Sequence, residues 1–82
     1  MVKIALDVRE LEHPKPMEEA LRCLQTMDES NYLYMIHRKN PIPLLQLVQK
    51  KGYKTLSHQD SDKNWHILIT KANLSLEELL DV

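Results

Sequence analysis

Four histidines are the side chains of this sequence best suited to acid–base or metal chemistry. They are spread along the chain as His13, His37, His58 and His66. Imidazole is the commonest protein ligand for zinc and similar ions, and it exchanges protons near neutral pH. No two of these histidines have the i, i+4 spacing of a helical metal motif, and the chain has no Cys-x-x-Cys pair, so the spacing predicts no specific metal site. Exposed histidines at loop edges are the simpler interpretation.

Basic and amide side chains accompany two of the histidines. Arg9 lies shortly before His13, and the run Arg38–Asn40 directly follows His37. Both groups precede an expected helix, and a helix N-terminus with arginines nearby can hold an anion. The candidate ligand-binding residues are therefore Arg9, His13, His37, Arg38, Asn40, His58 and His66.

The single cysteine offers little for catalysis. Cys23 is expected in the middle of a helix and beside its apolar face, where the helix dipole does not favour a thiolate. We interpret it as a small buried hydrophobic residue, and a lone cysteine also excludes an intrachain disulfide. The sequence predicts no catalytic residue and no cofactor, and a role without enzymatic activity is the preferred hypothesis.

These side chains are positioned by strands and helices that alternate in the first half of the chain. Val2 to Leu6 alternates apolar and polar residues, which predicts a strand. Pro14 and Pro16 introduce a helix expected over about 14–27, where apolar residues recur at helical spacing. Residues 32–37 are apolar on both faces, which predicts an interior strand.

A second helix is expected after this strand. We interpret Asn40 as its N-cap, with Pro41 at the first helical position. Lys50 and Lys51 suit its last turn, and Gly52 fits the left-handed position just past its end.

The last part of the chain predicts a hairpin and a tail helix. Residues 53–59 and 65–71 have strand patterns on either side of a polar turn at 60–64. Ser75 and Glu78 have capping-box spacing, which predicts a short C-terminal helix over about 75–81.

The resulting order, β-α-β-α-β-β, predicts an α+β fold. Two right-handed crossovers place both helices on one face of a mixed four-stranded sheet, which gives a two-layer α/β sandwich. In that topology all four histidines lie toward one edge of the sheet, where both helix N-termini point and where open α/β sheets bind ligands. The register of the hairpin decides whether His58 and His66 share a face, because a slip of one residue reverses the answer.

Length and composition limit the classes of partner. The 82 residues predict one domain over 1–82 with a core of about 2–71. The net charge of −1 gives no general attraction to nucleic acid or to an acidic membrane surface. No apolar run reaches the length of a membrane span, and the N-terminus lacks the apolar core of a signal peptide, so we expect a cytoplasmic location.

The entry to the first helix resembles that of the small sulfur-carrier domains of the TusA/SirA-like family, and more closely the branch known as domain of unknown function 2249. Those carriers have a leucine-aspartate pair, a connector and then Cys-Pro-x-Pro. The matching residues here are Leu6-Asp7 and Pro14-Lys15-Pro16, with His13 in the cysteine position. The resemblance continues through His37–Leu44, Gly52-Tyr53 and Trp65 and covers about residues 4–71. It implies the strand order 1-2-4-3, with the fourth strand antiparallel to the others.

Three hypotheses for the function follow. Because an imidazole at position 13 has no sulfur to carry, the preferred one is a non-catalytic module that binds a protein partner or a small ligand. The alternative is a sulfur-relay protein that uses Cys23 or a persulfide on another protein. The third is a sensor of a metal ion or an anion at the histidine edge. Nucleic acid is not expected as a partner.

Overall fold

The computed structural model describes residues 2–71 and has six elements in the predicted order. They are β1 (Val2–Asp7), α1 (Lys15–Thr26), β2 (Asn31–His37), α2 (Ile42–Lys50), β3 (Lys54–Gln59) and β4 (Trp65–Thr70). The helix expected over about 75–81 lies outside the described residues.

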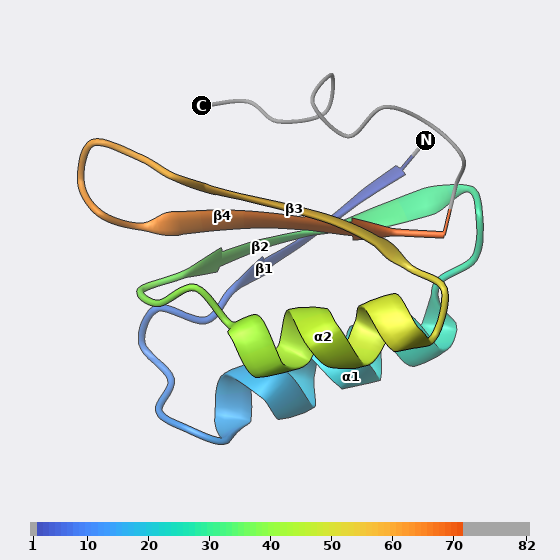
Figure 1. Cartoon of the computed structure of the whole chain (residues 1–82), viewed down its shortest axis with the longest axis horizontal. Coiled ribbons are helices and arrows are strands. Elements are labelled where there is room, and N and C mark those ends of the chain that lie inside the picture. Colours follow the sequence, from blue (N-terminus) through green and yellow to red (C-terminus); the bar gives the residue numbers. More distant parts are fainter. Residues whose placement is uncertain (1, 72–82) are drawn as a thin grey trace.

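The four strands form one mixed sheet in the order β1-β2-β4-β3. β1 is parallel to β2, whereas β4 is antiparallel to both of its neighbours. Both helices pack on the same face of this sheet (Figure 1). The α+β sandwich and the strand order 1-2-4-3 are therefore confirmed.

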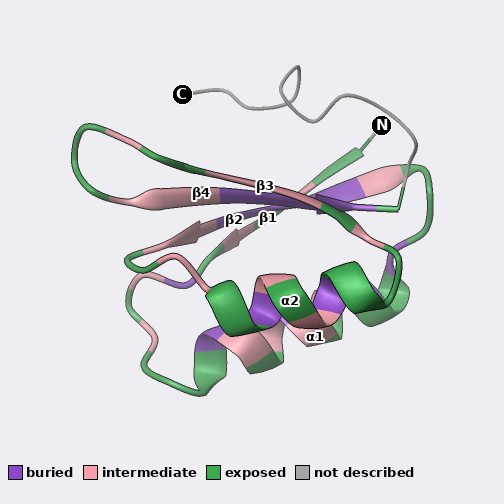
Figure 2. Ribbon diagram, viewed as in Figure 1, coloured by how far each residue is buried: buried purple, intermediate pink, exposed green. Residues whose placement is uncertain are grey.

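The two central strands carry the core. Leu33 and Met35 on β2 and Ile67 and Ile69 on β4 are completely buried against the helices. The same cluster contains Val8, Ala20, Leu24, Met27, Leu44 and Val48. Figure 2 shows this burial running along the middle of the sheet and the inner sides of both helices. Ile67 and Ile69 thus point toward the helices.

The two helices begin with the same Pro-x-Pro arrangement. Pro14 is the N-cap of α1 and Pro16 lies in its first turn, and Pro41 and Pro43 have the same places in α2. Proline fixes φ in the helical range but has no N–H to donate. Both helix starts therefore present apolar rings and fewer free backbone donors than an ordinary helix start.

The predicted N-cap of α2 is wrong, because the cap position holds Pro41 and no side chain caps the helix. An N-cap side chain bonds the N–H group two or three residues later. Two residues after Asn40, the N–H of Ile42 donates to the Asn40 backbone carbonyl at 2.9 Å. Three residues after it stands Pro43, which has no N–H. Neither of these two positions therefore has a free backbone N–H that could bond the side-chain oxygen of Asn40.

The end of α2 is as predicted. Gly52 has φ of +94°, the left-handed region that favours glycine. Its N–H donates to the Gln49 carbonyl at 3.1 Å, and the Tyr53 N–H donates to the Val48 carbonyl at 3.1 Å. The helix is closed there and the chain turns back into β3.

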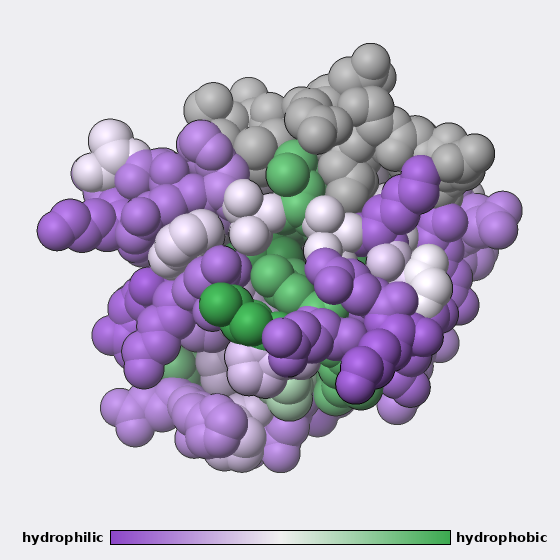
Figure 3. Space-filling model, viewed as in Figure 1, coloured by the Kyte–Doolittle hydropathy of each residue, from purple (hydrophilic) through white to green (hydrophobic). Residues whose placement is uncertain are grey.

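Most of the surface seen in Figure 3 is hydrophilic, with a narrow band of hydrophobic residues in the middle of the view. Among the described residues, the exposed large hydrophobic ones are Val2 at the start of β1 and Ile42 at the start of α2. Neither described helix has the length and hydropathy needed to cross a membrane.

Candidate ligand-binding site

A pocket of about 540 Å³ lies where both helices begin and where β2 ends. Its wall is built from the connector before α1, the first turn of α1, the link between β2 and α2, and the first turn of α2. The apolar lining residues are Leu11, Pro16, Met17, Pro41, Pro43 and Leu44. The polar ones are Glu12, His13, His37, Arg38, Lys39 and Asn40. The apolar lining residues are called the floor of the pocket and the polar ones its rim.

The two Pro-x-Pro segments explain why this pocket has apolar walls. Each contributes a first-turn proline to the lining, Pro16 from α1 and Pro43 from α2. Leu44, another lining residue, is almost completely buried. Because prolines replace backbone donors at both helix starts, hydrogen bonds to a ligand must come chiefly from side chains.

The rim contains two cations, Arg38 and Lys39. The side chains of Arg38 and Lys39 are exposed, and neither forms an ion pair with any residue between 2 and 71. By contrast, Lys15 pairs with Glu18 on the surface of α1. The rim thus holds two cations against one carboxylate, Glu12, and such an excess of positive charge beside an apolar floor attracts an anion that carries an apolar group.

His37 contributes a neutral hydrogen-bond donor. Its Nδ1 accepts a hydrogen bond from the Lys39 backbone N–H at 3.0 Å, so the ring proton lies on Nε2. Burial lowers the pKa of His37 from its usual 6.5, and the charges of Lys39 and Arg38 lower it further. At neutral pH the imidazole is therefore uncharged and offers Nε2–H.

The side-chain amide of Asn40 has a hydrogen-bond acceptor to which no described residue donates. Its Oδ1 is buried and has no hydrogen-bond partner among the described residues. A buried amide oxygen without a partner costs free energy, on the order of 1–3 kcal/mol. Asn40 also lines the pocket, so a turn of its amide toward the pocket would let a ligand hydroxyl or ammonium group bond this oxygen.

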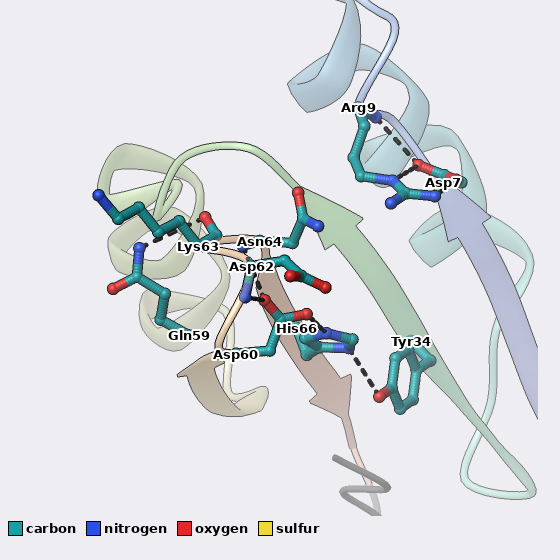
Figure 4. Close-up of polar contacts among 9 residues, drawn as sticks. All are labelled: Asp7, Arg9, Tyr34, Gln59, Asp60, Asp62, Lys63, Asn64 and His66. Atoms are coloured by element: carbon teal, nitrogen blue, oxygen red, sulfur yellow. Dashed lines mark hydrogen bonds and ion pairs between the residues drawn. The ribbon is translucent and has the colours of Figure 1, made fainter.

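The structure brings together four of the seven candidate residues, namely His13, His37, Arg38 and Asn40. Arg9 is not among the pocket residues. Its guanidinium holds the Asp7 carboxylate in two hydrogen bonds, of 3.0 Å from Nε and 2.7 Å from an η nitrogen (Figure 4). This bond lowers the pKa of Asp7 and raises that of Arg9. The side chain of Arg9 is thus held at the end of β1 by its ion pair with Asp7.

His58 and His66 lie on the face of the sheet that points away from the helices. They are paired directly opposite each other across β3 and β4. Directly paired residues point to the same side of a sheet, so this register places His58 and His66 on one face. His37, in contrast, is paired with Trp65, which packs against the helix-side core. The four histidines are at one end of the sheet but are divided between its two faces.

His66 is the centre of a chain of hydrogen bonds. Its Nδ1 lies 2.9 Å from the Tyr34 hydroxyl, and its Nε2 lies 2.8 Å from Asp60 Oδ2 (Figure 4). Asp60 Oδ1 also accepts the backbone N–H groups of Asp62 and Asn64, at 2.9 and 3.0 Å. The bond from His66 is the main reason why the pKa of Asp60 is lowered. This chain fixes the hairpin turn to the central strand β2.

A metal centre has little support from this geometry. Within residues 2–71, no group of three or more His, Cys, Asp or Glu side chains is placed to hold a metal ion.

Several residues of the pocket and of the hydrogen-bond chain were not among the sequence candidates. Glu12, Met17 and Leu44 line the pocket, but only the packing of two helices distant in sequence brings them together. The link from Asp60 to Tyr34 spans two strands that are not neighbours in sequence. The signal that could have found it is period-two alternation, which places Tyr34 and His66 on the face opposite Met35 and Ile67.

Residues 5–71 match the model of a family described as an uncharacterised conserved protein, DUF2249. No curated protein and no solved structure matches the chain.

Proposed function

We propose that this chain, which belongs to the DUF2249 family because most of its length matches that family, is a non-catalytic binding module for a small carboxylate with an apolar body. The ligand lies in the pocket between the starts of α1 and α2. Its carboxylate meets Arg38, Lys39 and the Nε2–H of His37, and its apolar part rests on Leu44 and the prolines.

The observation that carries this proposal is a pair of cations, Arg38 and Lys39, that form no ion pair with a described residue and stand beside an apolar floor. A hydrated inorganic anion would leave that floor unused, whereas a bare hydrocarbon would leave Arg38 and Lys39 unused. A carboxylate with a branched hydrocarbon group uses both. Burial of the hydrocarbon contributes about 25 cal/mol per Å² of apolar area, and charged hydrogen bonds contribute about 1.5–3 kcal/mol each.

The unsatisfied Oδ1 of Asn40 adds a further requirement. The Asn40 side chain lines the pocket, and a turn of its amide toward the pocket would favour a ligand that places a hydroxyl or ammonium proton opposite the oxygen. A 2-hydroxy or 2-amino acid with a branched side chain has the carboxylate, the donor and the hydrocarbon within a few bonds of one another. Its donor should improve binding over the plain carboxylate.

The alternative function, sulfur relay, has less support. Cys23 lies within α1 and not at its start, and burial raises the pKa of its thiol. His13 lines the pocket. The resemblance to the TusA/SirA-like carriers implies that His13 takes the position that those carriers give to cysteine. In our proposal this position has become part of a binding site, in one cytoplasmic domain over residues 1–82.

The experiment is an NMR titration of the ¹⁵N-labelled full chain with three probes that differ by one group each: isovalerate, 2-hydroxyisovalerate and the neutral amide of isovaleric acid. We expect shifts at the amides of His37–Asn40 and around Met17, with affinity falling from the hydroxy acid to the acid to the amide. Shifts confined to the 60–64 turn, or no shifts with any probe, would rule out the proposed site.

A further inference from the structure

The face of the sheet away from the helices carries a second buried cluster. It consists of Tyr32 and Tyr34 on β2 and Leu68 on β4, with Ile36 and Leu56 packed against them. Strand register places Ala5, Tyr34, Leu68 and Leu56 in one row across the sheet. A row of apolar residues therefore crosses the centre of this face.

The degree of burial in this cluster requires a cover. Leu68 has no exposed surface, and Tyr34 and Tyr32 are only 7% and 9% exposed. A tyrosine on an uncovered sheet face leaves one side of its ring in solvent. Both described helices pack on the opposite face, so neither can exclude water here (Figure 1). Ala5, at the β1 edge of the same row, is exposed, which places the covered region over β2 and β4.

The charged residues on this face indicate which charge a covering segment should carry. In the row nearest the end of β4, Lys3 and Lys54 lie at the two edges of the sheet. The Nζ of Lys3 lies 4.9 Å from the centre of the Tyr34 ring. At the other end of the face, the carboxylates of Asp7 and Asp60 are paired with Arg9 and His66. The apolar row is thus bordered by two lysines, and the nearby carboxylates of Asp7 and Asp60 are engaged by Arg9 and His66.

We propose that the segment following β4, residues 74–80, covers this cluster within the same chain. Its sequence, Leu-Ser-Leu-Glu-Glu-Leu-Leu, places Leu76, Leu79 and Leu80 on one side at helical spacing. Glu77 and Glu78 lie between these leucines, and no lysine or arginine occurs after Lys71. A leucine-rich, acidic segment complements an apolar row bordered by Lys3 and Lys54.

The path of the chain agrees with this assignment. β4 is a central strand, and its last residue, Thr70, is buried and donates its hydroxyl to the Asn31 carbonyl at 3.3 Å. The segment therefore leaves the sheet next to the cluster and not at an outer edge. A segment of seven residues does not hold a helix by itself, so any order in it must come from docking.

Two measurements on the full chain test the proposal. In amide hydrogen exchange, we expect residues 76–80 to exchange at least about tenfold more slowly than an unstructured peptide of the same sequence. In methyl NMR, we expect Leu79→Ser to remove that protection and to shift the methyl signals of Leu56, Leu68 and Ile36. The methyl signals of Leu44 and Val48, in the helix layer, should change little.

A matched tail variant and a dilution series complete the design. Asn73→Ser lies outside the leucine stripe and should leave both readouts unchanged. The protection should not depend on protein concentration, since the contact is within one chain. Exchange at the unstructured rate in the unmodified chain, methyl shifts centred on Leu44 and Val48, or protection lost on dilution would each overturn the proposal.

Discussion

His37 is held in one protonation state and one tautomer by its surroundings. Its Nδ1 is used by the Lys39 N–H, and its pKa is lowered by burial and by two neighbouring cations. The pocket therefore offers a donor at Nε2 without adding a third charge beside Arg38 and Lys39. In the proposed function, the cations would select a carboxylate and the imidazole would orient it.

The first prediction concerns this pKa. In the folded chain His37 should titrate below 6.5, and Lys39→Gln should raise the midpoint toward 6.5 without reaching it, because burial is the larger cause. The lowered pKa means that the unfolded chain binds the proton more readily. The contribution of His37 to stability is therefore full above about pH 6.5 and is lost as the pH falls through the folded pKa.

Imidazole ¹⁵N shifts measured across pH 4–8 test this directly. At pH 7 the spectrum should show an unprotonated Nδ1 and a protonated Nε2. A midpoint above 6.5, or the opposite tautomer, would contradict the environment described for His37.

The second prediction concerns Cys23, whose pKa is raised first by burial and then by the charge of Glu19. A thiol that resists ionisation is a poor acceptor of sulfur. Incubation with a cysteine desulfurase and cysteine should leave the intact mass of the protein unchanged. A sulfur adduct that disappears in Cys23→Ser would favour the sulfur-relay alternative.

At the scale of elements, the local sequence correctly predicted those features that depend on neighbouring residues alone. The alternation of Val2–Leu6, the two prolines at the start of α1 and Gly52 after α2 each predicted an element or a boundary that the structure has. The N-cap of α2 was mispredicted because Pro43 removes the donor that an Asn40 cap would use. The same mistake concealed the buried Oδ1 of Asn40, which has no hydrogen-bond partner among the described residues.

The third prediction concerns the hairpin between β3 and β4. Asp60→Asn removes the carboxylate that holds His66 and two turn N–H groups, so it should lower the urea midpoint at pH 7. Because the folded-state pKa of Asp60 lies below 3.8, this contribution is present above about pH 3.8 and is lost as the pH falls through the folded pKa. The difference between variant and wild type should therefore narrow in acid.

Asp62→Asn is the matched control for this prediction, since only the backbone N–H of Asp62 takes part in the turn. Its urea midpoint should stay close to that of the wild type at every pH. Equal losses from both variants would mean that the turn responds to net charge and not to the hydrogen bonds of Asp60.

At the scale of the whole molecule, the sheet divides the candidate residues. The topology placed all four histidines at one end, but it did not determine which face each would occupy. Directly opposed pairing of His58 with His66 and of His37 with Trp65 settles that, and the exact register depends on tertiary packing. The pocket also needs both helix starts side by side, which no local pattern encodes.

The affinity of pocket variants for 2-hydroxyisovalerate, measured by calorimetry on the full chain, tests the proposed binding site most directly. The variant Arg38→Gln/Lys39→Gln removes the two cations of the rim. The control Lys50→Gln/Lys51→Gln removes two adjacent cations at the far end of α2 and changes the net charge equally. We expect the rim variant to bind about tenfold more weakly, a loss of about 1.4 kcal/mol, and the control to bind as the wild type does. Equal affinity of the two variants, or no binding by the wild type, would contradict the account.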